Sequence, residues 1–192
     1  MKMPPYTVVA LVASGGLCIG SFVAGFATAP WPPAQGITSV VSSQVVARDI
    51  PTYTRQAKSV VVGTVVEIGD PYEFDLGVNC ETTIRHDVTV AVERVLHGED
   101  EGSQVTLAVE GGSIGNETVT AQDEAAFRDG ERVLVFVGTN EDGDDIVFAG
   151  AYGKLTVSKD GASVFGNAGL QLPLQAVIDE IQAAVRPEGI PG

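Results

Sequence analysis

One short motif in the chain has the form of a hydrolase nucleophile. The string Gly-Gly-Ser-Ile-Gly at residues 111–115 matches G-x-S-x-G, which surrounds the serine of many α/β-hydrolases. In those enzymes the string joins a strand to a helix, and the histidine follows the serine in the chain. Here the string precedes a predicted strand, Glu117 to Ala121, and both histidines come before Ser113. We therefore predict a glycine-rich hairpin turn and assign no catalytic residue.

Three residues outside the N-terminal segment could bind a soft metal ion: Cys80, His86 and His97. Their spacing matches no zinc pattern, because structural zinc sites draw on closely paired cysteines or histidines. His86 shares strand parity with Val88 and is expected to point inward, whereas His97 is expected in a solvated turn. We predict no metal site and no cofactor.

Residues 140–145, Asn-Glu-Asp-Gly-Asp-Asp, place several oxygen ligands in one predicted hairpin. Such oxygen atoms are the ligands that calcium prefers. The segment lacks the glutamate of an EF-hand loop at the twelfth position, and its glycine comes too early. Two interpretations stay open: a solvated acidic turn, which we favour, or a weak calcium site.

The N-terminal segment, residues 1–30, contains 23 residues without a charge, from Thr7 to Ala29. At ~1.5 Å per helical residue it would reach about 34 Å, enough to cross a bilayer core of ~30 Å. Tyr6 and Trp31 flank the segment as interfacial aromatics would, and the positive charge of Lys2 and the amino terminus places the following chain outside the cytoplasm. A cleavable signal peptide is the alternative, since residues 27–29 form a small-x-small site. Because Pro30 would make this a poor cleavage site, we favour a retained anchor.

Small residues recur every four positions in this segment, at Gly16, Gly20 and Ala24. Such a stripe allows two membrane helices to approach closely and to dimerise weakly. The alternative is that glycine is simply frequent in membrane segments.

The charge of the chain is strongly acidic and unevenly distributed. All 25 acidic residues lie after residue 30, as do all but one of the 11 basic residues. Nucleic acid is therefore excluded as a partner, because binding phosphates requires clustered lysine and arginine. Only Cys80 lies in the acidic part, so no disulfide can form within it.

The hydrophobic pattern predicts the elements that must position these groups. Residues 31–48, rich in proline and serine, read as a linker, and residues 49–192 as one domain. Asp49 and Pro51 predict a short helix over residues 49–59, and apolar residues at helical spacing predict an amphipathic helix after Pro173. Between them we expect seven strands. These are 59–68, 82–96 with a bulge near Arg94, 104–110, 117–121, 132–138, 145–151 and 154–158.

Three segments carry a resemblance to a known group of domains: residues 57–65, AKSVVVGTV, residues 88–98, VTVAVERVLHG, and residues 127–137, FRDGERVLVFV. They look like secreted prokaryotic domains that resemble the OB-type barrel of tissue inhibitors of metalloproteinases and netrin modules. The resemblance covers roughly residues 50–185. It implies an OB-type barrel. Together with the patterns above, it predicts a mainly β fold, a small antiparallel OB-like barrel with a short helix before it and an amphipathic helix after it, preceded by one transmembrane helix. The chain lacks the N-terminal cysteine and the disulfides of those inhibitors, so no inhibitory residue carries over.

We expect a membrane-tethered, non-catalytic module that binds an unidentified extracytoplasmic protein or polymer. An OB-type barrel typically binds through the loop after its first strand, here residues 69–81, so Tyr72 and Phe74 are the predicted contacts. Three alternatives remain: a secreted hydrolase using Ser113 or a metal at His86, a protease-inhibitor-like domain, or a structural envelope protein. The two rings could also simply cover the end of the barrel.

Overall fold

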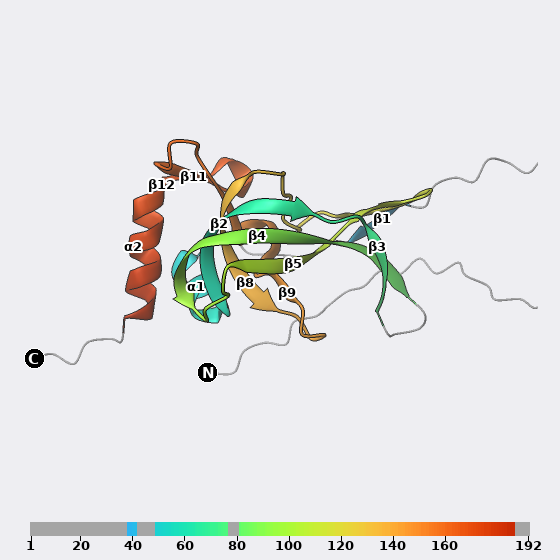
Figure 1. Ribbon diagram of the computed structural model, residues 1–192, viewed down its shortest axis with the longest axis horizontal. Helices are drawn as coiled ribbons and strands as arrows, with labels where there is room; N and C mark the ends of the chain where they lie inside the picture. Colours follow the sequence, from blue (N-terminus) through green and yellow to red (C-terminus); the bar gives the residue numbers. More distant parts are fainter. Residues whose placement is uncertain (1–37, 42–48, 77–80, 187–192) are drawn as a thin grey trace, which may run out of the picture. The chain divides into compact units, whose positions relative to one another are not determined.

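The computed structural model describes residues 38–41, 49–76 and 81–186, all within one compact unit, residues 34–192. This part of the chain is mainly β, with one helix before the main sheet and one after it, as expected (Figure 1). The helices are α1 (Ile50–Gln56) and α2 (Leu174–Val185), with short 3-10 turns η1 (Gly150–Tyr152) and η2 (Asn167–Gly169). The strands are β1 (Thr38–Val41), β2 (Ser59–Ile68), β3 (Tyr72–Asp75), β4 (Thr82–Gly98), β5 (Gln104–Glu110), β6 (Gly112–Ile114), β7 (Glu117–Ala121), β8 (Arg132–Thr139), β9 (Asp145–Val147), β10 (Lys154–Val157), β11 (Ser163–Phe165) and β12 (Gln171–Pro173).

The first helix begins where the sequence predicts. The side chain of Asp49 accepts the backbone N–H of Thr52 at 3.1 Å, and a proline occupies the first turn. The helix ends at Gln56, because Ala57 adopts an extended conformation that leads into β2. Tyr53 on the buried face meets Phe136 and Phe148 edge-on, with ring centroids 5.9 and 6.0 Å apart. These contacts fix the helix against the sheet.

In the described part of the chain, the main sheet runs in the order β12-β11-β10-β8-β2-β4-β3, with β5 also paired to β4 and β9 to β8. Strand β2 pairs antiparallel with both β4 and β8. The register between β2 and β4 shifts on either side of Arg94, which confirms the bulge predicted there.

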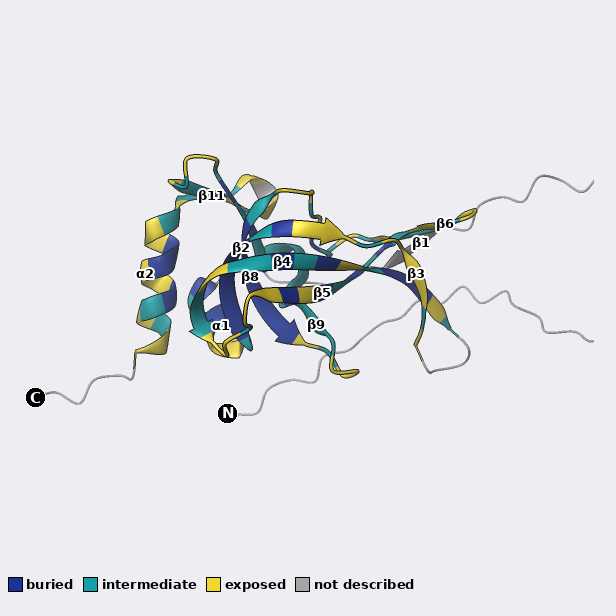
Figure 2. Cartoon of the chain, viewed as in Figure 1, coloured by how far each residue is buried: buried dark blue, intermediate teal, exposed yellow. Residues whose placement is uncertain are grey.

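Strands β2 and β8 bury side chains on both of their faces, as the dark ribbons of Figure 2 show. On one face Val60, Val62 and Phe136 pack with α1 and α2. On the other face Val61, Val65 and further valines pack against β4, β5 and β9. Burying each such side chain contributes roughly 1.5–3 kcal/mol, so these two strands organise both halves of the core.

The expected closure into a barrel is wrong. Strand β5 lies beside β9, but no ladder joins them, and the sheet stays open there. The reason is local: β9 has only three residues, and the chain then leaves the sheet at Ala149 (φ 63°) and Gly150 (φ 54°) to form η1. The segment predicted as a strand over 145–151 therefore ends early.

A second, smaller sheet has the order β1-β7-β6. Its first strand, Thr38–Val41, lies within the predicted linker and pairs in parallel with β7. Strand β3 forms a hairpin with the start of β4, although residues 69–81 were expected to form an irregular loop.

The predicted N-terminal anchor, its Gly16, Gly20 and Ala24 stripe, and Cys80 all lie outside the described residues. Of the helices that are described, neither combines the length and hydropathy required to cross a bilayer.

The tight pairing of β2 with β4 predicts that Gly63→Ala destabilises the domain. An added Cβ would collide with the backbone oxygen of Ala91 and lie 2.6 Å from a methyl carbon of Val90. Because the backbone cannot easily move, we expect a loss of about 2 kcal/mol or more in urea unfolding. Val66→Ala on the same strand, where the side chain is 47% exposed, is the control and should cost less than about 1 kcal/mol. Equal losses in the two variants would contradict the packing argument.

Candidate functional site

The open side of the sheet holds a pocket of about 330 Å³, between β5 and β9. This volume lies in the range of small-ligand sites, at its lower end. One part of the lining is apolar and comes from β5, β9 and the start of η1: Ala108, Ile146, Val147, Ala149 and Gly150. The other part is polar: Arg85, Glu110, Asp123, Glu124 and Asn140. Four separate stretches of chain therefore build the pocket.

Arg85 is the most buried charged side chain of the pocket, with 8% of the residue exposed. It lies on β4 directly opposite Glu110 of β5, and their side chains approach to 3.7 Å. Its guanidinium also lies 3.5 Å from Asp144 and 3.9 Å from Asp142 of the acidic turn. The ring of Phe74 covers it at 3.5 Å. Arg85 thus contacts three elements: the β3 hairpin, β5 and the acidic turn of residues 140–145. We call Arg85 and these three elements together the Arg85 edge.

Glu124 enters the pocket from the segment between β7 and β8. The pKa of its carboxyl is raised from 4.5 to about 7, chiefly by burial and also by the negative charge of Glu110. The backbone N–H of Ala125 and the charge of Arg85 oppose this shift but do not cancel it. Near neutral pH the carboxyl is therefore divided between its protonated and ionised forms, which is typical of groups at functional sites.

The wall that carries Glu124 is fixed by a half-buried ion pair. The ammonium of Lys154 lies 2.7 Å from the carboxylate of Glu131 and donates to the backbone oxygen of Ala126 at 2.8 Å. Burial alone would raise the pKa of Glu131, but Lys154 and the hydroxyl of Thr156 hold it below its usual value. The carboxylate thus stays ionised and keeps the segment in place.

The opposite wall depends on a glycine. Gly150 has φ 54°, and its N-terminal neighbour Ala149 is the one non-glycine residue with a positive φ in the described ranges. A Cβ at position 150 would collide with the backbone oxygen of Asp123, which accepts the N–H of Ala151 at 2.7 Å. Close approach of these two backbone segments thus requires glycine here.

The predicted contact residues Tyr72 and Phe74 lie on β3. Tyr72 is 38% exposed and its hydroxyl donates to Asp87 at 3.0 Å. Phe74 is half-buried and packs on Arg85. Phe74 thus forms part of the Arg85 edge, whereas the Tyr72 ring remains accessible.

The residues considered for catalysis have other partners. The hydroxyl of Ser113 lies 2.9 Å from that of Thr118 across the β6–β7 hairpin, so a hairpin is present as predicted, but Ser113 lies in strand β6 and the turn falls at residues 115–116. His86 donates through Nδ1 to the backbone oxygen of Gly111 at 3.0 Å. His97 lies in β4 and is half-buried, contrary to the expected solvated turn.

The acidic turn directs its carboxylates at cations of the chain. Asp145 lies 3.0 Å from Lys58, and Asp142 and Asp144 face Arg85. Asn140 closes the turn by accepting the N–H groups of Asp142 and Asp144. In the described ranges no three histidine, cysteine, aspartate or glutamate side chains gather as a metal site would require.

No protein-family model matches the chain, and no curated protein matches it. Function is therefore argued from the geometry of the Arg85 edge and its pocket.

The position of Glu124 predicts a pH-dependent cost in stability. Its folded-state pKa is raised, so its favourable contribution is present below pH 4.5 and is lost as the pH rises to about 7. Glu124→Gln should therefore leave the free energy of unfolding nearly unchanged at pH 5 and raise it by about 1–3 kcal/mol at pH 8. Glu141→Gln removes the same charge from an exposed position outside the pocket and is the control. A gain that is equal at both pH values would show that burial of the carboxylate is not its cause.

Proposed function

We propose that this domain is a non-catalytic binding module that works outside the cytoplasm and recognises its partner at the Arg85 edge. One observation carries the proposal: Arg85 brings Phe74 of the β3 hairpin, Glu110 of β5 and the acidic turn to one side of a ligand-sized pocket. Pockets of this kind, with an apolar wall and a few convergent polar groups, are the usual form of a binding site.

The topology supports this location. Strands β2, β4, β5, β8 and β9 pair in the order β5-β4-β2-β8-β9, with β5 beside β9. A five-stranded, partly open arrangement is characteristic of OB-like folds, which bind through the loops after the first and the fourth strand. The β3 hairpin and the acidic turn occupy these two positions. We propose an OB-like relationship on this basis, with the β5–β9 ladder missing.

A hydrolase that uses Glu124 as its general acid is the second candidate. A carboxyl with a pKa of about 7 beside a second carboxylate suits proton transfer to a leaving group. Turnover of a glycan or ester substrate that is lost in Glu124→Gln and retained in Glu180→Gln, an exposed position of α2, would favour this candidate over the binding module. Ser113 is not part of it, because the partner of its hydroxyl is Thr118.

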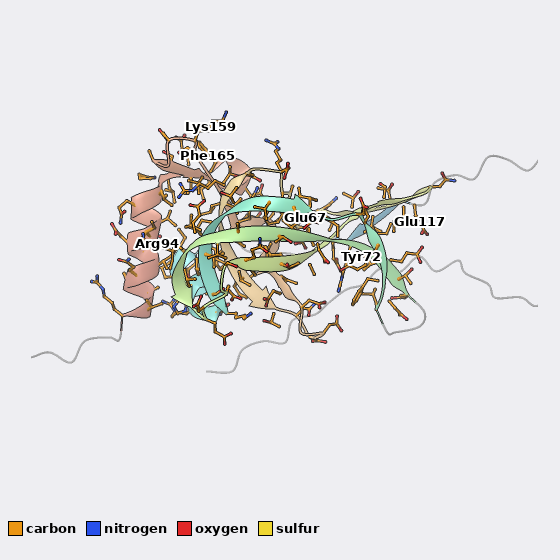
Figure 3. The ribbon with its side chains drawn as sticks, viewed as in Figure 1. Glu67, Tyr72, Arg94, Glu117, Lys159 and Phe165 are labelled. Carbon is orange, nitrogen blue, oxygen red and sulfur yellow. The ribbon has the colours of Figure 1, made fainter. Side chains whose placement is uncertain are left out.

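Partner binding should depend on Tyr72 and Phe74. If the full chain retains a partner from an envelope extract, replacing both rings by alanine should weaken retention by roughly tenfold or more, because central aromatic anchors dominate interfaces. Phe165→Ala is the control: this ring is 42% exposed but belongs to β11, at the other end of the sheet from Tyr72 (Figure 3). Ser113→Ala should also bind normally. Unchanged retention in the Tyr72/Phe74 double variant would reject the Arg85 edge as the contact surface.

The tether is a proposal from the sequence, and it can be tested directly. Mass spectrometry of the native protein should find residues 1–30 still attached, because Pro30 follows the best cleavage site. A mature N-terminus near residue 28 or 30 would instead establish a secreted domain.

A further inference from the structure

Within the pocket, the negative charge of an ionised Glu124 is not neutralised by a neighbouring positive side chain. The guanidinium of Arg85 already faces Glu110, Asp142 and Asp144, and Phe74 covers its face. The field of Glu110 acts on Glu124 more strongly than that of Arg85. No lysine, arginine or histidine of the described ranges forms an ion pair with Glu124. A positive charge beside this carboxylate would therefore offset both the desolvation cost of its ionised form and its repulsion by Glu110.

The apolar lining and the volume of the pocket indicate which uncharged part such a ligand would have. Ala108, Ile146 and Val147 form an apolar wall that can cover an aliphatic stem but offers it no hydrogen bonds. A volume of about 330 Å³ accepts a chain of a few carbons and its head group. The formal charge of the protein is −14, and such a field concentrates cations around it.

We propose that this pocket binds an alkylammonium group, whose stem lies on the Ala108 and Ile146 wall and whose ammonium pairs with the carboxylate of Glu124. A lysine side chain of a partner protein and a free aliphatic amine carry the same chemistry. The inference rests on the proposed binding function, because it names the group that the partner presents to the Arg85 edge.

Formation of the ion pair between the ammonium and Glu124 would be coupled to the release of a proton. A Glu124 carboxyl that is protonated in the free protein releases its proton to the buffer when the ammonium binds, and the resulting carboxylate forms the ion pair. The charged groups that face Glu124 are Glu110 of β5, Arg85 of β4 and Asp123 of its own segment. With a pKa of about 7 in the free protein, the coupling makes binding weaker as the pH falls below 7.

Calorimetry on the full chain in a non-ionic detergent tests the proposal with N-acetyl-lysine N-methylamide as the probe. Binding at pH 8.5 should exceed that at pH 5.5 by roughly tenfold or more. At pH 7, buffers of different ionisation enthalpy should reveal the release of about half a proton. N-acetyl-norleucine N-methylamide has a similar stem without the ammonium and should bind at least tenfold more weakly. Cadaverine distinguishes the two sources, because tighter binding of this diamine than of the lysine probe indicates a free amine.

Two variants separate the pocket from general attraction to an acidic protein. Glu124→Gln should weaken the lysine probe by about tenfold at pH 8.5 and abolish the pH dependence, whereas Glu180→Gln, at an exposed position of α2, should do neither. Ala108→Leu fills the apolar wall and should weaken binding while every charge remains; a thermal melt confirms that each variant is folded. Equal binding of the lysine and norleucine probes would overturn the proposal, as would lysine binding that Glu124→Gln leaves unchanged.

Failure of this inference differs from failure of the proposed function. If a partner is retained through Tyr72 and Phe74 but neither the lysine probe nor cadaverine binds, the alkylammonium assignment is wrong and the binding module stands. If the probes bind as expected but partner retention is unchanged when Tyr72 and Phe74 are replaced by alanine, the β3 contact surface is wrong.

Discussion

The need to bury both faces of β2 governs the rest of the structure. A strand whose consecutive residues Val60, Val61 and Val62 are all inaccessible to solvent requires a cover on each side. The two helices provide one cover, since α1 and α2 pack on the face that carries Val60. The sheet provides the other by curling, so that β5 and β9 come to lie over Val61 and Val65. Helix packing and sheet curvature are thus two consequences of a single hydrophobic segment.

The same curl explains why a polar pocket exists at one end. Strand β4 has 17 residues and extends beyond β2, which has ten, so its first residues pair only with β3 and β5. At this end the lining changes from valine to Arg85 and its carboxylate neighbours. These charges need water or partners, and the gap left where β9 ends at Val147 provides the space for them. A binding pocket here arises from incomplete closure of the sheet.

Sequence patterns predicted the long elements well, because their signals are local. Strands β2, β5 and β7 have the predicted limits, set by apolar runs and by breaks such as Gly111, whose φ is positive. Strands β3, β6, β11 and β12 have three or four residues, and their strand conformation depends on neighbours distant in sequence. Closure of the barrel was predicted wrongly for the same reason, because it depends on pairing between β5 and β9, which are distant in sequence. The sequence contains no signal for the pocket, since Glu124 follows Asp123 in an ordinary acidic connection and acquires its environment only when folding buries it near Glu110 and Arg85. Likewise, the acidic turn resembled a cation site because the sequence does not reveal that Lys58 and Arg85 reach its carboxylates.

The position of β2 also has a consequence for biosynthesis. Its second partner, β8, begins at Arg132, more than sixty residues after β2 ends at Ile68, and α2 completes the helical cover only at Val185. Contacts between such distant segments form slowly, and unpaired apolar strands associate with other chains in the meantime. The valine-rich β2 of the growing chain therefore lacks β8 and the cover of α2 until the chain has been made as far as Val185. Holdase chaperones that shield extended apolar segments would have their binding site here, and it would disappear when the last helix docks.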